Sequence, residues 1–284
     1  MPRSIARVII DFHTHILPPS FKRRRAEIAA RDATFRALFA NPKAKIATAA
    51  QLIRAMDEDG VDRAVVVGYG WCDRDIAREA NDYLLDSAER HPKRIIPFCS
   101  VNPDWGDEAL REVENCLDAG ARGIGELHPT TQQFRLKGKK MRDLMRLAAR
   151  RDVPVLVHGS EPVGHDYAGK GATDPATLLG LAEAFPKNRL IFAHWGGGLP
   201  FYALMPEVRK ALANTYFDTA ASPLLYQQSV FRTVANAAGM ERVLFGSDYP
   251  LLRPKRVAEQ AMSGLTSKQA AEVLGGNAKT LLGL

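Results

Sequence analysis

Histidine and aspartate side chains end several apolar stretches of the sequence, where together they could bind a metal ion. The stretch that starts at Val8 ends in an H-x-H pair, His13 and His15, and alternate side chains of a β-strand point to one face. Three further apolar stretches end in His158, His194 and Asp248. Imidazole and carboxylate groups from several strand ends form the ligand sets of catalytic divalent metals. The sequence therefore predicts a metalloenzyme.

These stretches belong to a regular alternation of strands and helices. Eight short, almost wholly apolar stretches predict strands that are buried on both faces: residues 8–15, 62–68, 94–100, 121–127, 153–158, 189–194, 215–219 and 242–247. Amphipathic stretches predict helices at 49–58, 76–90, 109–119, 140–151, 200–213, 223–238 and 254–262, one that begins at Pro175 after Thr173 or Asp174 as its cap, and two short ones at the end.

Eight strands that alternate with helices predict an α/β fold, a (β/α)8 TIM barrel. An open doubly wound sheet is the alternative, but no Gly-x-Gly-x-x-Gly follows a strand, and the triplet Gly196-Gly197-Gly198 lacks the lysine of a phosphate loop. We expect residues 1–284 to form a single barrel domain. Residues 16–47, an oversized connection, are expected to form a small helical insertion that caps the barrel mouth.

The positions of the histidines favour a site at one end of this barrel, because barrel active sites lie at the carboxyl ends of the strands. Five of the seven histidines fall at such ends: His13, His15, His128, His158 and His194. His165 follows the fifth strand on the same side, and only His91 is expected on the opposite face.

The bulk composition is that of an ordinary globular protein, with 46% hydrophobic residues. The net charge of +7 is spread over several segments without interleaved aromatic residues, so we expect no nucleic-acid partner, although some charges could steer an anionic substrate. Three widely spaced cysteines and the lack of a signal-peptide pattern at Met1–Ile10 predict a cytoplasmic protein. No apolar stretch is long enough to span a bilayer, so we expect no membrane partner.

Four segments carry a resemblance to a known group of enzymes: Ile10–His15, Phe192–Gly197, Leu244–Pro250 and Gly276–Leu282. Over nearly the whole chain the sequence resembles the amidohydrolase superfamily, and within it the branch that includes aminocarboxymuconate-semialdehyde decarboxylase. The resemblance implies that His13, His15, His158 and Asp248 hold the metal, and that Asp248 also takes a proton from metal-bound water. It implies that His194 binds a second metal in binuclear members, or does acid–base work in mononuclear ones.

Glu126, in the segment Ile-Gly-Glu of the fourth strand, departs from the decarboxylase pattern. Metal-dependent deoxyribonucleases of the same superfamily carry a similar glutamate that bridges two metals, and a carboxylate can bind one ion with each oxygen. We therefore include Glu126 among the metal ligands, with orientation of a ligand histidine as the alternative.

Several other residues are candidates for substrate contacts, with packing or solvent exposure as the alternative for each. They are His128, His165, Trp195, Tyr249, and the arginines Arg24, Arg25 and Arg54, which could pair with a substrate carboxylate.

The expected function is metal-dependent hydrolysis of a small, carboxylated substrate by an activated water, with Asp248 and His194 as catalytic residues. The alternative is a non-oxidative decarboxylase on the same site. A phosphodiesterase acting on nucleic acid is a third possibility, and a barrel whose histidines serve only structure or metal storage is a non-enzymatic fourth. We expect one or two ions per chain, zinc with manganese as the alternative, a small anionic substrate and a homodimer.

Overall fold

The computed structural model describes residues 8–284, and it contains eight parallel strands at the eight apolar stretches. They are β1 (Ile10–Thr14), β2 (Arg63–Val66), β3 (Ile95–Pro97), β4 (Ile124–Leu127), β5 (Val155–Val157), β6 (Leu190–Phe192), β7 (Thr215–Asp218) and β8 (Val243–Leu244). Each strand is shorter than the stretch that predicts it, because paired hydrogen bonding ends before the apolar character does. Residues 1–7, part of the stretch without a signal-peptide pattern, lie outside the described residues.

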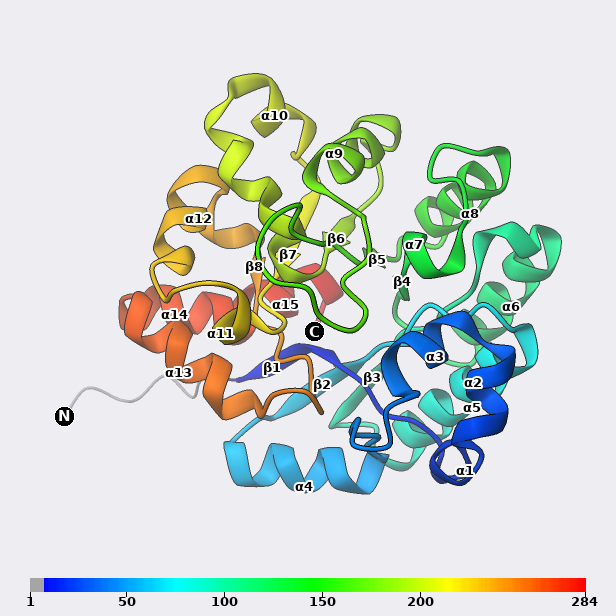
Figure 1. The fold of residues 1–284 in the computed structure, drawn as a ribbon. Helices are drawn as coiled ribbons and strands as arrows, with labels where there is room; N and C mark the ends of the chain where they lie inside the picture. The colour runs from blue at the N-terminus through cyan, green and yellow to red at the C-terminus, as the bar shows by residue number, and fades with distance from the viewer. Residues whose placement is uncertain (1–7) are drawn as a thin grey trace.

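Backbone contacts join the strands into a closed ring (Figure 1). Regular pairing runs β1-β2-β3 and β4-β5-β6-β7-β8. Single bridges connect the two groups. One joins Cys99, just after β3, to Ile124 of β4, and the other joins Thr14 of β1 to Tyr249 beyond β8. The Phe12 amide also donates to the Phe245 carbonyl at 2.6 Å. The predicted (β/α)8 barrel is therefore confirmed.

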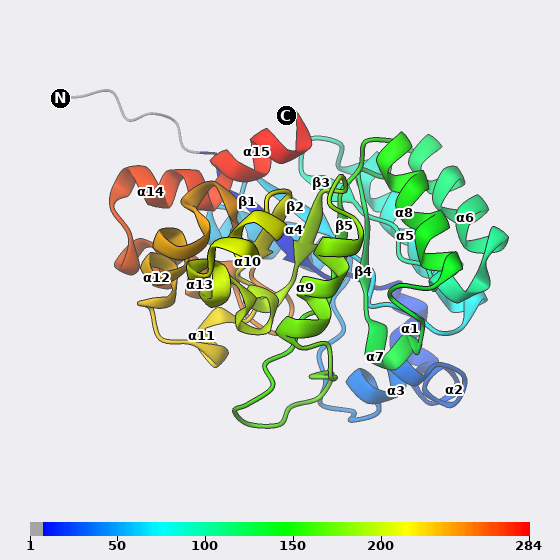
Figure 2. The same ribbon diagram turned by 90° about the horizontal axis from the view of Figure 1, so that it is seen from above.

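Alternate residues of the strands pack on the two sides of the barrel wall, as the strand period of two requires. Val65 belongs to a buried cluster with residues of β1, β3, β5, β6 and β8, which fills the interior. Ala64 and Val66 instead pack against α4 (Ala49–Asp59) on the outside. Leu281 of α15 (Asn277–Leu282) joins the interior cluster, so this helix closes the end of the barrel away from the loops (Figure 2).

The larger outer helices match the predicted amphipathic stretches. They are α4, α5 (Arg74–Arg90), α6 (Asp107–Asp118), α8 (Lys139–Arg150), α9 (Pro175–Ala184), α12 (Val230–Ala238) and α13 (Pro254–Gly264). Of the two predicted caps for α9, Asp174 is the one used, since its side chain accepts a hydrogen bond from the Thr177 amide at 2.8 Å. Shorter elements are α7 (Pro129–Gln132), α14 (Ser267–Ala271), η1 (Pro103–Trp105), η3 (Met240–Arg242) and η4 (Glu272–Gly276).

Two predicted helices are wrong as single elements. The stretch 200–213 is divided into η2 (His194–Leu204) and α10 (Pro206–Ala211), because Met205 before a proline is extended, with φ −84° and ψ 122°. The stretch 223–238 is divided into α11 (Ser222–Leu225) and α12 at Tyr226, which is also extended.

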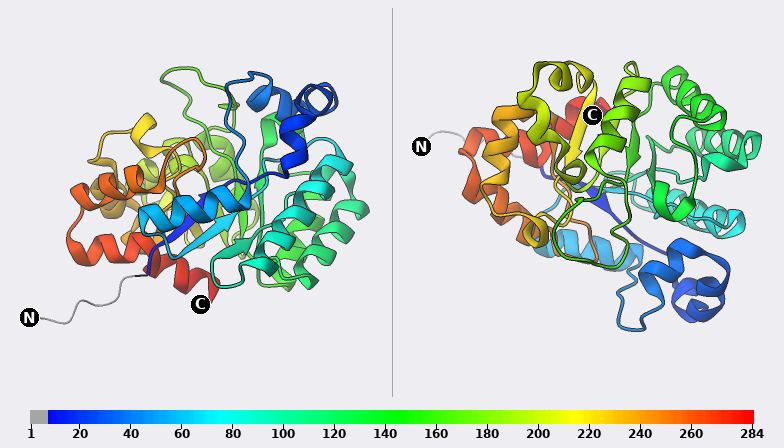
Figure 3. Two further views of the ribbon diagram at one scale, coloured as in Figure 1. Left: turned by 90° about the horizontal axis from the view of Figure 1, so that it is seen from below. Right: turned by 45° about the horizontal axis from the view of Figure 1, so that its top comes forward.

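Residues 16–47 hold three short helices, α1 (Pro19–Arg23), α2 (Arg25–Arg31) and α3 (Ala33–Phe39). Phe21, Phe35 and Trp71 are fully buried in one cluster that fixes these helices to the barrel. Figure 3 shows α1–α3 on the same side of the barrel as the long loop between β5 and α9, and α15 on the other side. Within residues 8–284, no helix is both long and apolar enough to cross a membrane.

Candidate metal centre

His13 and His15 of the H-x-H pair direct one ring nitrogen each toward a common point. Their Nε2 atoms lie 3.0 Å apart. The opposite nitrogen of each ring is already bonded, since His13 Nδ1 lies 2.8 Å from an Asp218 carboxylate oxygen and His15 Nδ1 lies 3.1 Å from the Val67 carbonyl. When Nδ1–H donates to these oxygens, both Nε2 atoms carry lone pairs that can ligate a metal.

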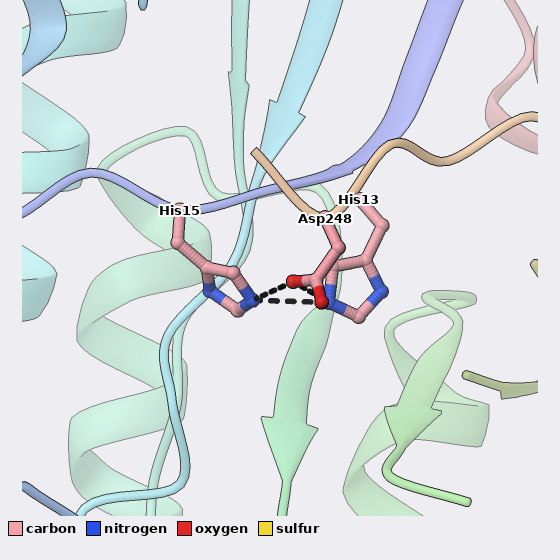
Figure 4. Close-up of side chains that lie close together, drawn as sticks. All are labelled: His13, His15 and Asp248. Carbon is pink, nitrogen blue, oxygen red and sulfur yellow. Dashed lines mark hydrogen bonds and ion pairs between the residues drawn. The ribbon is translucent and has the colours of Figure 1, made fainter. Parts of the chain in front are cut away.

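Asp248, in the loop after β8, brings a carboxylate to the same point from the strand that adjoins β1 in the closed ring. Figure 4 shows its carboxylate facing both imidazoles, with Oδ1 3.4 Å from His15 Nε2 and 3.9 Å from His13 Nε2. The Asp248 amide donates to the His13 carbonyl at 2.9 Å, which fixes the loop after β8 against β1. The ligand atoms of His13, His15 and Asp248 all lie within 4.8 Å of one another.

Glu126, at the carboxyl end of β4, lies among four histidines. Its Oε1 is 2.8 Å from His158 Nδ1 and 3.9 Å from His194 Nε2. Its Oε2 is 3.7 Å from His13 Nε2 and 3.9 Å from His15 Nε2. Burial opposes ionisation, but the charges of His158, His13 and His194 hold the pKa of Glu126 well below its usual range. The glutamate is therefore ionised, and with His13 and His194 it forms a second group that could hold a cation.

His194 belongs to the second of these groups of converging ligand atoms, whereas His158 lies beside both groups. The His194 Nδ1 bonds to the Ala220 carbonyl at 3.1 Å, so its Nε2 faces Glu126. His158 uses both ring nitrogens, Nδ1 on Glu126 and Nε2 at 3.1 Å from the Lys170 carbonyl. Of the six predicted ligands, the structure brings five into the two groups of converging atoms and leaves His158 beside them.

Asp218, the last residue of β7, is a functional candidate that the sequence reasoning did not identify. It is fully buried, and besides His13 Nδ1 it accepts the backbone amides of His194 and Ala220, each at 3.0 Å. A single carboxylate thus orients His13 and holds the start of the turn that carries His194. Its place at the carboxyl end of an apolar strand was the available signal.

The charge balance of the centre fits a cation. Burial disfavours a charged imidazole, yet the carboxylates of Asp218, Glu126 and Asp248 together raise the pKa of His13 to about 10. The pKa of Asp248 is lowered to about 2 against the effect of burial, by the His15 hydrogen bond and the charges of His194 and His13. Two buried carboxylates, Asp218 and Glu126, and the partly exposed Asp248 surround the nitrogen donors and favour positive charge, and a mixed N/O donor set suits zinc or manganese.

The turn that carries His194 depends on glycine. Five consecutive residues, His194 to Gly198, have positive φ values, a conformation that costs little only for glycine. A Cβ on Gly197 would lie 2.2 Å from the Ser160 carbonyl oxygen. The glycine triplet therefore lets the β6 turn lie against the loop after β5, which explains it without a phosphate ligand.

A cavity of about 440 Å³ opens above the metal-ligand cluster. His15, Glu126, His158, His194 and Asp248 form its polar floor. Its walls are mainly apolar: Leu38, Phe39, Tyr69, Ala168, Ala221, Leu224, Leu225, Pro250 and Leu251. The remaining basic or polar lining residues are Lys43, Lys45, His128, His165 and Tyr167, and the small residues Ala44 and Gly169 complete the lining. This volume suits a small molecule.

The other predicted contact residues divide between the cavity and elsewhere. His128 and His165 line the cavity. His128 stacks on His158 with ring centroids 4.1 Å apart, and burial and the His158 charge lower the pKa of His128 to about 3, so it is neutral. Trp195 is fully buried and donates to Ser222, which makes it a packing residue. Tyr249 lines a neighbouring hollow.

The three candidate arginines do not line the cavity, which agrees with the alternative given for them and not with a substrate contact there. Arg24 pairs with Glu27 and Glu79. Arg25 donates to three backbone carbonyls within the insertion, and Arg54 lines the neighbouring hollow. Arg24 and Arg25 reach nearer acceptors, which the sequence pattern could not show.

Comparison with known proteins identifies the family. A family model described as Amidohydrolase matches residues 10–284, so the chain belongs to this family and the resemblance is confirmed. A 2-amino-3-carboxymuconate-6-semialdehyde decarboxylase of Dictyostelium discoideum is 22% identical over 97% of this chain and 91% of its own length. A gamma-resorcylate decarboxylase of Rhizobium radiobacter is 23% identical over 62% of this chain and 66% of its own.

A solved structure shows the same fold. It is a 5-carboxyvanillate decarboxylase mutant from Novosphingobium aromaticivorans with bound manganese and 3-methoxy-4-hydroxy-5-nitrobenzoic acid, with a TM-score of 0.79 and 17% identity over 98% of each chain. Because the family model covers residues 10–284, the protein is an enzyme of the amidohydrolase superfamily. Its named relatives are decarboxylases, which favours the predicted alternative over the expected hydrolysis.

Proposed function

We propose that the protein is a metal-dependent non-oxidative decarboxylase of a small aromatic or otherwise unsaturated carboxylic acid. The observation that carries the proposal is the mainly apolar cavity of about 440 Å³ whose floor holds His15, Glu126, His194 and Asp248. A planar acid could lie against the apolar walls with its carboxylate toward the floor. Relatives named for decarboxylation of carboxylated substrates support this interpretation.

We propose that His13, His15 and Asp248 hold the divalent cation, with Glu126 and His194 beside it and His158 orienting Glu126. Both zinc and manganese suit these donors, and the manganese in the related structure favours manganese. When bound, the cation supplies positive charge that holds the substrate and stabilises negative charge as it develops. A homodimer stays a prediction.

The chemical step breaks the bond between the carboxyl carbon and the rest of the substrate. The bonding electron pair remains on the substrate carbon, which takes a proton, and carbon dioxide leaves. Asp248 is ionised at neutral pH because its pKa is about 2, so it first takes a proton from a substrate hydroxyl or from solvent and then delivers it to carbon. The apolar walls exclude water from the developing carbanion.

The test is the identity of the products. Protein loaded with manganese or zinc is incubated with a panel of hydroxybenzoic acids and unsaturated dicarboxylic acids in water enriched in oxygen-18. Decarboxylation predicts carbon dioxide equal to the substrate consumed, and no heavy oxygen in the organic product. Products that contain heavy oxygen, without carbon dioxide release, would contradict the proposal and support hydrolysis.

Hydrolysis remains the second candidate because of one observation, the position of Glu126. Its two oxygens face different histidines, His158 and His194 on one side and His13 and His15 on the other. This placement would suit a bridge between two ions and a water-activating centre. Elemental analysis separates the two candidates, since two ions per chain would favour hydrolysis and one would favour the decarboxylase.

A further inference from the structure

A second hollow, of about 510 Å³, lies beside the proposed active-site cavity and is lined by basic side chains. It is formed by α1, α2, the segment 42–47, α4 and the loop before α13. Its cationic residues are Lys22, Arg25, Lys43, Lys45, Arg54 and Arg253, whereas Glu58 is the one acidic residue in its lining.

Only part of this positive charge is balanced by the protein. Arg253 forms ion pairs with Glu58 at 2.8 Å and with Asp59 at 2.7 Å, which accounts for the acidic residue of the lining. Arg25 is held by backbone carbonyls of the insertion. The remaining four cations have side chains that form no ion pair and donate no hydrogen bond within residues 8–284: Lys22, Lys43, Lys45 and Arg54.

The arrangement differs from that of a charged helix face in water. Solvated charges on one helix diverge, whereas these side chains come from separate segments and line one concave surface. A concave surface lined by one sign of charge focuses the field and concentrates counter-ions. The hollow therefore combines uncompensated donors with a shape that could enclose a small anion.

The hollow also adjoins the cavity above the metal centre. Lys43, Ala44, Lys45 and Pro250 line both. Lys22 and Arg54 line the hollow but not the cavity. These two residues can therefore be changed without altering the lining of the proposed active site.

We propose that the hollow is a second anion-binding site, separate from the metal centre, for a small molecule that carries at least two negative charges. Ammonium and guanidinium groups form charge-assisted hydrogen bonds with carboxylate and phosphate oxygens alike. The ligand is thus a dicarboxylate or a phosphate. This site goes beyond the proposed decarboxylase activity and does not depend on it.

The test is calorimetric titration of the full-length, metal-loaded protein with inorganic phosphate and, separately, with succinate. The wild-type protein should bind one equivalent in the hollow, distinct from a probe held at the metal centre, and the tighter of the two probes at the hollow identifies the source of the anion. Arg54→Gln and Lys22→Gln should each weaken binding about tenfold, the effect of losing one charge-assisted contact. Arg54→Lys should weaken it less, because the charge remains.

Two control variants separate binding in the hollow from binding elsewhere on the protein. Lys93→Gln removes an exposed lysine between α5 and β3, which no described residue pairs with, and should bind like the wild type. His13→Ala changes the metal centre, and it should keep the equivalent bound in the hollow while it loses a probe held at the metal. The proposal is overturned if Arg54→Gln and Lys22→Gln bind normally, if Lys93→Gln weakens binding as much as they do, or if His13→Ala abolishes it.

Discussion

Asp218 determines which nitrogen of His13 faces the metal-ligand cluster. Its carboxylate lies 2.8 Å from His13 Nδ1, and it also binds the His194 amide. We predict that Asp218→Asn weakens metal affinity about 10- to 100-fold, because an amide supports the required tautomer and ligand basicity less well. Competition with a fluorescent chelator measures this affinity.

The matched control for this prediction is Asp118→Asn. Asp118 is exposed and pairs with Arg151 on the surface, so its loss should not change metal affinity. Wild-type affinity in Asp218→Asn would show that His13 keeps its orientation without the carboxylate.

Asp248 combines two predicted roles, as a metal ligand and as the proton carrier. The substitution Asp248→Asn retains size but removes the charge and the proton-accepting oxygen. We predict a loss of carbon dioxide release of at least about 100-fold in kcat, with unchanged circular dichroism. His13→Ala should abolish turnover in the same way. Near wild-type turnover in either variant would contradict the assigned roles.

At the scale of elements, the β6 turn tests the need for glycine in the site. Gly197 has φ +60°, and a Cβ there would meet the Ser160 carbonyl. We predict that Gly197→Ala lowers the free energy of unfolding by at least about 2 kcal/mol, from left-handed strain and this collision, as measured by urea denaturation. Gly60→Ala is the matched control, since Gly60 has φ +71° but no atom within 4 Å of an added Cβ, and it should cost about 1 kcal/mol. Equal losses would assign the effect to φ alone.

The cap of α9 provides a prediction with a pH dependence. The hydrogen bonds from Thr177 hold the pKa of Asp174 below its usual value of 3.8, so the ionised form is favoured in the folded state. Asp174→Ala should lower the free energy of unfolding by about 1 kcal/mol at pH 7. The part of this difference that comes from the ionised carboxylate should be fully present above pH 3.8 and be lost as the pH falls through the lower folded pKa. Asp174→Asn, which still caps, should lose little at pH 7, and a difference that grows with acidity would contradict the role of the ionised cap.

The sequence predicted the strands and the outer helices, but not the division of two of the helices. The strands were predictable because burial on both faces leaves continuous apolar stretches, and the outer helices because their apolar faces pack on the barrel wall. The division of 200–213 and 223–238 depends on extended backbone at Met205 and Tyr226, which apolar periodicity does not show.

The same limit applies to the site. Strand ends predicted which side chains meet, since five of the six ligand candidates converge. The hydrogen bond of His158 to the Lys170 carbonyl depends on the path of a long loop, which no local pattern specifies. Asp218 was overlooked because one aspartate after a strand is a weak signal without the histidine that it orients.

At the scale of the whole molecule, the metal centre spans the seam between the first and last strands. His13 and His15 belong to β1 and its extension, whereas Asp248 follows β8. β1 and the segment from Phe245 to Tyr249 share an isolated bridge at Thr14 and Tyr249 and the hydrogen bonds of the Phe12, His15 and Asp248 amides, rather than a regular ladder. A cation bound by residues from both sides would therefore tie the seam together, and barrel stability should depend on metal loading.

We predict that saturation with manganese or zinc at about 100 times the dissociation constant stabilises the protein by about 2.7 kcal/mol, which corresponds to a rise in Tm of roughly 4–5 °C for a chain of this size. Calorimetry before and after chelation measures the change, and hydrogen exchange should slow most at the Phe12 and Asp248 amides of the seam. The rise should disappear in His13→Ala but persist in His91→Ala, because His91 follows α5 at the opposite end of the barrel. A Tm that ignores chelators would instead mean that the histidines and carboxylates hold the seam by their own hydrogen bonds, and the metalloenzyme interpretation would fail with it.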